Sequence, residues 1–205
     1  MPHTQVPWRV PTHPTKEKLI TTVVEMLQEG PAEGRIEEIL KRSGVSTGSL
    51  YHHFEDLEDL IECAYARRFA MFVDVSIGLL ANVSETVTSR EEMLAGLFEV
   101  TRLTQSSALK PIRYERARIV SMAQHNERFA SALRVEQQRL TDAIEDLIRN
   151  AQEHEWMNKD FDPRVGAVMI QAYTLGKVVD DVSEEPMDPE AWDRLVNMII
   201  EKVFS

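Results

Sequence analysis

Residues 36–54 read IEEILKRSGVSTGSLYHHF, and their spacing indicates two short helices joined by a tight turn. The first helix should end at Gly44, because glycine adopts positive φ without a steric penalty. Ser46 is a suitable N-cap for a second helix through about His53, and a buried Val45 would fix the turn between them. This spacing is typical of a helix-turn-helix unit.

On both sides of this stretch, apolar residues recur every three or four positions, and almost no alternating β pattern is present. Asp162-Pro163 and Asp188-Pro189 each combine an acidic N-cap with proline at the first helical position. We therefore predict an all-α fold of about nine helices. They are expected over residues 15–29, 36–43, 46–53, 54–80, from 89, 111–123, 126–155, 163–179 and 189–203.

Composition limits the classes of protein that are possible. The 205 residues, 43% of them hydrophobic, suffice for one substantial core with a small head. No run approaches eighteen uncharged apolar residues, and the first residues lack the apolar segment of a signal peptide, so no membrane partner is expected. The single cysteine, Cys63, cannot form an intramolecular disulfide, which fits a cytoplasmic protein.

The second helix of the turn has one face free for a ligand. Leu50 and Phe54 lie four residues apart and should face the core. The remaining side chains can approach the major groove of DNA, where hydroxyl groups contact phosphates or base edges. The expected DNA contacts are Lys16, Lys18, Arg35, Ser46, Thr47, Gly48, Ser49, Tyr51, His52 and His53; packing within the head is the alternative for Tyr51 and His53.

The same stretch resembles the tetracycline-repressor (TetR) family of bacterial regulators. The matching residues are Ile39, Gly44, Val45, Ser46, Gly48, Leu50, Tyr51, His53 and Phe54. The resemblance implies an N-terminal three-helix DNA-binding head and a C-terminal helical body for ligand binding and dimerisation. We therefore expect an arm over residues 1–14, a DNA-binding domain over 15–60 and a body over 61–205.

Two positions depart from the family pattern. Leu57 replaces the lysine that usually grips a phosphate at the start of the next helix, and Thr47 replaces a basic residue. Residues 1–60 carry six Lys/Arg against ten Asp/Glu, a net charge of -4. DNA binding should therefore be modest and steeply salt-sensitive, and an adaptor of the same fold that has lost DNA binding is the alternative.

Other motifs do not indicate an enzyme or a metal site. Gly44-Val-Ser-Thr-Gly48 has the Gly-x-Ser-x-Gly form of a hydrolase nucleophile, but that motif requires a preceding strand, and here a helix precedes it. His52 and His53 are neighbours, which places them about 100° apart on a helix. We expect no metal, no cofactor and no catalytic residues.

The body carries candidates for a ligand pocket and for a dimer interface. Flexible methionines and aromatic rings can line a largely apolar pocket, formed here by Phe69, Phe72, Met93, Phe98, Tyr114, Met122, Met169 and Tyr173. Arg113, Arg116 and Arg118 could offer one cation to an acidic ligand. The predicted interface comprises Val165, Met169, Ala172, Gly176, Val179, Trp192, Leu195, Val196, Ile199 and Val203. The alternative for both sets is plain core.

These observations predict a homodimeric transcriptional regulator. As a dimer it would bind a two-fold-symmetric operator in double-stranded DNA, and it is expected to be a repressor that a small molecule releases.

Overall fold

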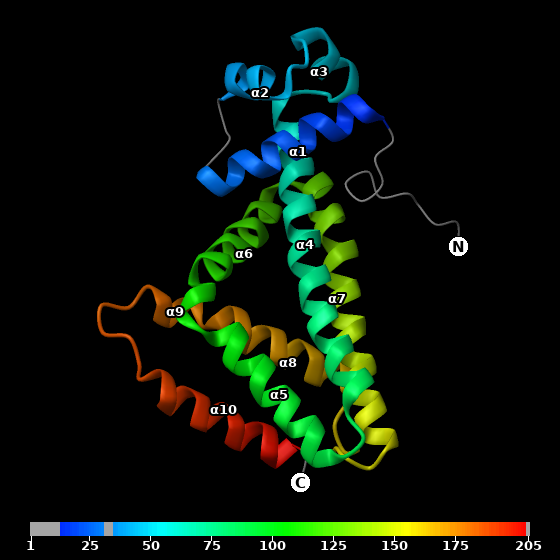
Figure 1. Ribbon diagram of the computed structural model, residues 1–205, viewed down its shortest axis with the longest axis vertical. Coiled ribbons are helices and arrows are strands. Elements are labelled where there is room, and N and C mark those ends of the chain that lie inside the picture. The colour runs from blue at the N-terminus through cyan, green and yellow to red at the C-terminus, as the bar shows by residue number, and fades with distance from the viewer. Residues whose placement is uncertain (1–12, 31–34, 204–205) are drawn as a thin grey trace. The chain divides into compact units, whose positions relative to one another are not determined.

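The computed structural model describes residues 13–30 and 35–203, and all regular structure within them is helical (Figure 1). The predicted all-α class is confirmed. The α-helices are α1 (Pro14–Glu29), α2 (Ile36–Ser43), α3 (Thr47–His53), α4 (Leu57–Thr86), α5 (Arg90–Gln105), α6 (Lys110–Met122), α7 (Glu127–Glu153), α8 (Pro163–Gly176), α9 (Val178–Asp181) and α10 (Pro189–Val203). Short 3₁₀ turns at Ser107–Leu109 and Ala123–His125 flank α6.

The residues predicted to begin and end helices do so. Gly44 follows α2 with φ of 61°, the left-handed conformation that glycine adopts most readily. The Ser46 hydroxyl accepts from the Ser49 main-chain N–H at 3.2 Å and caps α3. At the start of α8 the Asp162 carboxylate accepts from the N–H groups of Arg164 and Val165 at 2.8 and 3.0 Å. Local chemistry therefore fixes these boundaries.

Three expectations were wrong in detail. Helix α4 continues past residue 80 to Thr86, because Val83 lies on its buried side and packs against Gly96 of α5. The helix expected over 163–179 breaks at Lys177, and α9 follows as a separate four-residue helix. Val45 is only half-buried in the turn.

The chain divides into two compact units. The first contains the described residues up to Phe72 together with residues 122–136, and the second contains residues 73–121 and the described residues from 137 onward. The expected DNA-binding domain, residues 15–60, falls within the first unit as far as it is described. The expected functional boundary at residue 60 stays a prediction.

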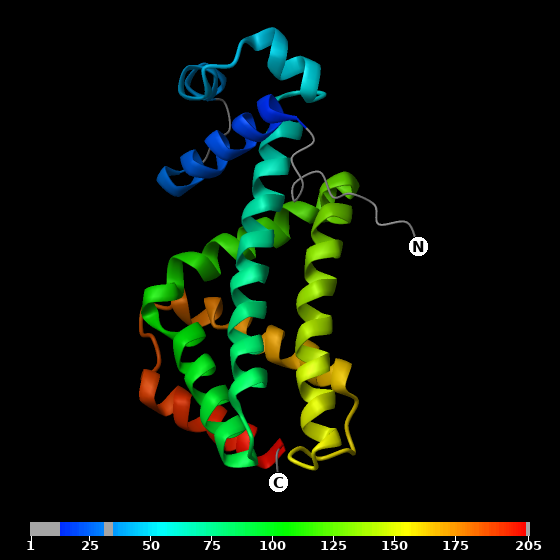
Figure 2. The same ribbon diagram turned by 45° about the vertical axis from the view of Figure 1, so that its right-hand side comes forward.

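In the first unit, α1 packs against α2 and α3, and both views show it crossing the first turns of α4 (Figures 1 and 2). Leu50 and Phe54 are buried, as their spacing predicts. The core side chains of this unit include Leu19, Ile20, Val23, Ile39, Tyr65, Phe69 and Phe129. This core supports α3 from beneath and leaves its other face exposed.

In the second unit, α10 packs along α5 (Figure 1). Met93 and Ile119 are fully buried, and Val196 of α10 is 4% exposed. Arg113 of α6 donates two hydrogen bonds to the Asp181 carboxylate, from Nε at 2.6 Å and from Nη2 at 2.8 Å. This ion pair joins α6 to the end of α9.

Helix α4 is long and apolar enough to cross a membrane, with a mean hydropathy of 1.3 over its most apolar eighteen-residue window. A core helix can meet the same length and composition criteria. The helix also carries Asp74, whose carboxylate accepts from Arg139 of α7 at 3.1 Å, and charges are costly in the middle of a membrane span. This is weak evidence for a span, and the absence of a membrane partner stays a prediction.

Candidate nucleic-acid interface

Helix α3 presents an exposed polar face. Tyr51 is 51% exposed, and Thr47, Gly48 and His52 are exposed as well. Ser49 and His53 are half-buried at its edges, while Leu50 anchors the opposite face in the core. The face therefore combines small side chains, which allow close approach, with one long hydroxyl-bearing side chain.

Histidines gather where α3 ends beside the start of α1. The ring of His53 lies 4.4 Å from that of His13, which caps α1, and 5.0 Å from that of His52. Burial, together with the neighbouring His13, His52 and Lys16, lowers the pKa of His53. Among the residues that the structure describes, no three His, Cys, Asp or Glu side chains are placed to hold a metal ion.

The basic residues of the head differ in whether a side chain of the same chain already pairs with them. Lys18 is exposed, and the Lys16 ammonium lies 5.0 Å from the centre of the Phe54 ring. The Nε of Arg35 donates to Glu38 at 2.8 Å, so this arginine is already paired within the chain. Part of the positive charge predicted to meet DNA is thus neutralised internally.

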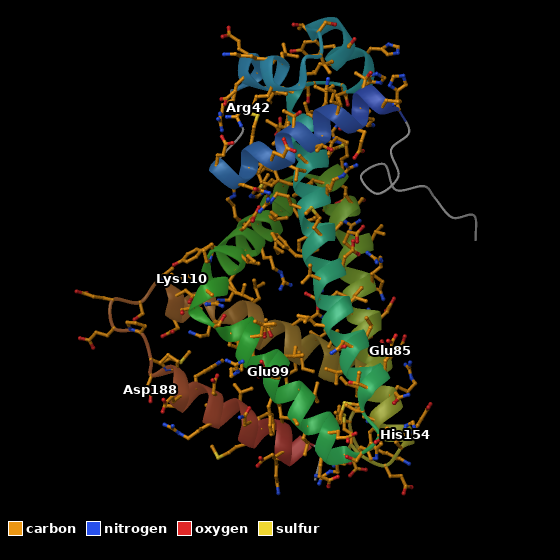
Figure 3. All side chains as sticks on the ribbon, in the orientation of Figure 1. Arg42, Glu85, Glu99, Lys110, His154 and Asp188 are labelled. Atoms are coloured by element: carbon orange, nitrogen blue, oxygen red, sulfur yellow. The ribbon has the colours of Figure 1, made fainter. Side chains whose placement is uncertain are left out.

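Arg42 is paired in the same way. Its guanidinium donates to both carboxylate oxygens of Glu29 at 2.6 and 2.8 Å, and it also contacts Glu38 (labelled Arg42 in Figure 3). The hydrogen bonds from Arg42 hold the pKa of Glu29 below its ordinary value. No local pattern indicates this pairing, because Glu29 and Arg42 lie thirteen positions apart.

The acidic start of α4 is partly neutralised as well. Arg128 of α7 donates to Glu62 at 3.0 Å and to Glu55 at 3.0 Å, and its guanidinium lies 3.8 Å from Asp59. Leu57 is half-buried in the first turn of α4. The negative charge that the sequence places at this edge is therefore smaller than the residue count suggests.

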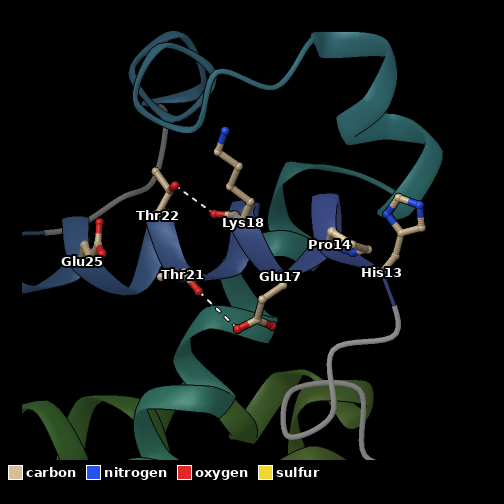
Figure 4. Close-up of a pocket in the computed structure, with 7 residues that line it drawn as sticks. All are labelled: His13, Pro14, Glu17, Lys18, Thr21, Thr22 and Glu25. Carbon is tan, nitrogen blue, oxygen red and sulfur yellow. Dashed lines mark hydrogen bonds between the residues drawn. The ribbon is translucent and has the colours of Figure 1, made fainter.

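A groove runs along α1 from His13 to Glu25 (Figure 4). It is lined by α1 and its capping residue alone, and Glu17 within it is paired with Arg67 and accepts from the Thr21 hydroxyl at 3.3 Å. With its lining drawn from a single helix, the groove is an open helix face and does not enclose a ligand.

The predicted pocket residues are divided between the two units. Phe69, Phe72 and Met122 belong to the first unit and the other five to the second. Phe69 and Met93 are fully buried, whereas Tyr114 is 36% and Met169 is 51% exposed. The Tyr114 hydroxyl donates to the main-chain oxygen of Asp181 at 2.9 Å. The ligand pocket stays a prediction.

Most of the predicted interface residues lie on the surface of the single chain. Val165, Met169, Ala172, Gly176, Val179, Leu195 and Ile199 are exposed, and Trp192 is half-buried. Val196 is instead buried within the single chain, at 4% exposed. The interface as a whole stays a prediction. The side chain of Val203 lies outside those that the structure describes. Val168, Val182 and Met198 are also exposed.

Comparisons with known proteins agree with this architecture. Residues 19–64 match the family model described as bacterial regulatory proteins, tetR family. No curated protein sequence matches the chain.

Solved structures with the same fold cover nearly the whole chain. The reduced form of E. coli NemR is 20% identical, with a TM-score of 0.64 over 94% of this chain and 99% of that one. A putative TetR-family transcriptional regulator from Mesorhizobium loti is 14% identical, with a TM-score of 0.68 over 92% of this chain and 94% of that one. FadR from Bacillus subtilis, solved with stearoyl-CoA, is 16% identical, with a TM-score of 0.59 over 90% of this chain and 96% of that one.

At these identities the structural likeness concerns the fold, and the family model concerns the helix-turn-helix region. The two agree, since the matched residues include the capped turn and the exposed face of α3. Residues 19–64 therefore match the N-terminal region of the tetR family of bacterial regulatory proteins, on an all-helical fold that the chain shares with solved transcriptional regulators.

Proposed function

We propose that this protein is a homodimeric repressor that binds a two-fold-symmetric DNA operator and is released by a small molecule. The observation that carries the proposal is the exposed polar face of α3, held by the Ser46 cap and the buried Leu50. A helix supported in this way can enter the major groove, and its hydroxyl groups can meet phosphates and base edges.

Affinity for DNA should be modest. The pairing of Arg35 and Arg42 with glutamates leaves Lys16, Lys18 and Lys41 as the other Lys/Arg side chains in the described part of the head. Each phosphate that a protein neutralises contributes about one unit to the slope of log affinity against log salt. In place of the steep salt dependence expected from the sequence, a dimer with few free cations per head should therefore show a shallow slope and depend on its α3 contacts for specificity.

Selection from a random duplex library, followed by fluorescence anisotropy across a salt series, tests this function. We expect an enriched palindromic sequence, with half-sites one helical turn apart, bound more tightly than a scrambled duplex. If no sequence is enriched and no duplex binds at low salt, the protein does not bind DNA. The internally paired arginines and the acidic start of α4 favour the adaptor in that case.

The exposed apolar residues of α8, α9 and α10 support dimerisation. Val165, Val179 and Leu195 are 66%, 74% and 47% exposed in the single chain, which is a large amount of apolar surface to leave in water. Pairing two such helices with their symmetry mates forms a four-helix interface. A second copy of the chain is therefore the proposed occupant of this surface.

Ile199→Glu tests the interface. A carboxylate placed there without a partner should dissociate the dimer, because desolvating the charge costs several kcal/mol. Val120→Glu on α6, where the native side chain is 44% exposed, serves as the matched control and should leave the dimer intact. Sedimentation velocity at micromolar concentration distinguishes the two, and a dimer that persists in Ile199→Glu would remove α10 from the interface.

Release by a ligand would follow from population shift. DNA and the small molecule would favour different arrangements of the dimer, and linkage requires each to weaken the binding of the other by the same factor. A titration of operator affinity against effector concentration, paired with the reverse titration, measures both factors. Unequal factors at equilibrium would exclude this mechanism.

A further inference from the structure

The three arginines of α6 that could bind an acidic ligand have different surroundings. Arg113 is already neutralised by Asp181, and its Nη1 donates to the main-chain oxygens of Thr104 and Ser106 at 3.2 and 2.9 Å. Arg118 is exposed. Arg116 is half-buried, and within residues 13–30 and 35–203 it has no hydrogen bond or ion pair.

A second group of unpaired polar atoms lies at the end of α5. Gln105 is 5% exposed, and neither its amide nitrogen nor its amide oxygen has a hydrogen-bond partner. The hydroxyl of the next residue, Ser106, is also buried and unpaired. Since most buried polar groups in proteins are paired, three such atoms on adjacent residues require an explanation.

The two groups share one corner of the second unit. The Arg113 guanidinium contacts the main chain on both sides of Gln105, so this face of α6 lies against the end of α5. Arg116 follows Arg113 by three positions and therefore lies near it on the same side of the helix. From this spacing we expect Arg116 on the side of α6 nearest the unpaired amide of Gln105 and the unpaired hydroxyl of Ser106.

The face of α5 leading to this corner is largely apolar. Phe98 and Thr101 precede Gln105 by seven and four positions, which places the three on one side of the helix. Phe98 is half-buried, and Thr101 is buried. The aromatic ring of Phe98 therefore lies on the side of α5 that leads toward the unpaired polar atoms.

Leaving these groups unpaired is costly. A buried amide or hydroxyl without a partner loses its hydrogen bonds to water, and an unpaired cation loses more of its hydration. Burial lowers the pKa of Arg116, which indicates the same loss of solvent around the guanidinium. A bound anion would pair the donors among these groups, because it accepts from the guanidinium, the Gln105 amide N–H and the Ser106 hydroxyl at once.

We propose that the corner between α5 and α6 binds the anionic group of an amphipathic effector, with Arg116 as its charge partner and Gln105 and Ser106 as hydrogen-bond donors. The inference rests on the proposed function, since it names the class of molecule that would release the repressor. The apolar part of the effector lies along the α5 face that carries Phe98. Carboxylates and phosphates share this chemistry.

Isothermal titration calorimetry with decanoate, decyl phosphate and decanol tests the site in the full-length protein. We expect one of the two anions to bind and decanol to bind at least tenfold more weakly. Arg116→Met should weaken the anion at least tenfold and leave decanol unchanged. Arg118→Met, which removes an exposed arginine from the same helix, should bind all three probes like the wild type.

Thermal unfolding without any probe gives a second readout. If Arg116 is unpaired in the free protein, Arg116→Met should raise Tm by about 2–4 °C, the shift expected for about 1 kcal/mol in a chain of this size. Gln105→Leu should also raise Tm. Arg118→Met should leave Tm unchanged.

Failure of both anions to bind, or equal anion affinities in the wild type and Arg116→Met, overturns the proposal. The relative affinities of decanoate and decyl phosphate identify which anion the corner prefers. Duplex binding by Arg116→Met without a probe separates this inference from the proposed function. If Arg116→Met binds the selected duplex while neither anion binds the wild type, the effector class is wrong and the DNA-binding function stands.

Discussion

Removing either partner of the buried ion pair between Arg113 and Asp181 should strongly destabilise the second unit. The side chains are 4% and 6% exposed, and two hydrogen bonds join them. Removing one partner of a buried pair costs about 3–5 kcal/mol, because the other charge stays buried. Asp181→Asn should lie at the low end, about 3 kcal/mol, since Arg113 keeps its bonds to two main-chain oxygens.

A double-mutant cycle separates the pair from its surroundings. Arg113→Met combined with Asp181→Leu removes both charges of the pair, so the double variant should be closer to the wild type than either single variant. Urea unfolding, followed by circular dichroism at one fixed chain concentration, measures all four proteins. Single-variant costs below about 1 kcal/mol, or costs that simply add in the double variant, would refute this reasoning.

The same pair predicts how stability depends on pH. The hydrogen bond from Arg113, more than its charge or those of Lys177 and Lys110, holds the pKa of Asp181 below its ordinary value. A depressed carboxyl pKa contributes stability that is fully present above the unfolded-state value of about 4 and is lost as pH falls through the folded-state value. The wild type should therefore lose more stability than Asp181→Asn between about pH 5 and pH 2, and parallel profiles would contradict this assignment.

Three further outcomes follow. Tyr51→Ala should weaken operator binding by about 1–3 kcal/mol if its hydroxyl contacts a phosphate, without changing the circular dichroism; an unchanged Kd would remove Tyr51 from the interface. Leu57→Lys should steepen the salt slope of duplex binding by about one unit, whereas equal slopes would show that the start of α4 stays away from the DNA backbone. Burial, aided by Asp59, raises the pKa of the Cys63 thiol to about 11, so alkylation by iodoacetamide at pH 7.5 should be much slower than that of free cysteine, and a comparable rate would contradict the burial.

Local sequence signals predicted the helices well because their causes are local. Ser46 and Asp162 cap helices through bonds that span two or three residues, and Gly44 ends α2 through its own φ. The end of α4 was less predictable. Whether that helix stops near residue 80 or continues depends on the packing of Val83 against Gly96, which no local pattern reports.

The candidate sites show more clearly that local patterns do not report contacts between distant residues. The exposed face of α3 followed from the spacing of Leu50 and Phe54, since a short helix with one buried side must expose the other. By contrast, Arg113 and Asp181 lie 68 positions apart, and nothing near either residue indicates the pairing. The sequence indicates three candidate arginines on α6. Which of them is already neutralised depends on where residues distant in the sequence lie in the fold.

The inclusion of residues 122–136 in the first unit limits how the head can be recombined with other proteins. Asn126 caps the start of α7 and donates to Glu62, while Phe129 is 1% exposed in the core. A chimera that joins the chain up to Phe72 to a foreign effector domain would lack this segment and would expose the apolar surface that it covers. Transplanting the DNA specificity of this protein therefore requires two cuts and a graft of the first half of α7, or a recipient whose own helix fits the same core.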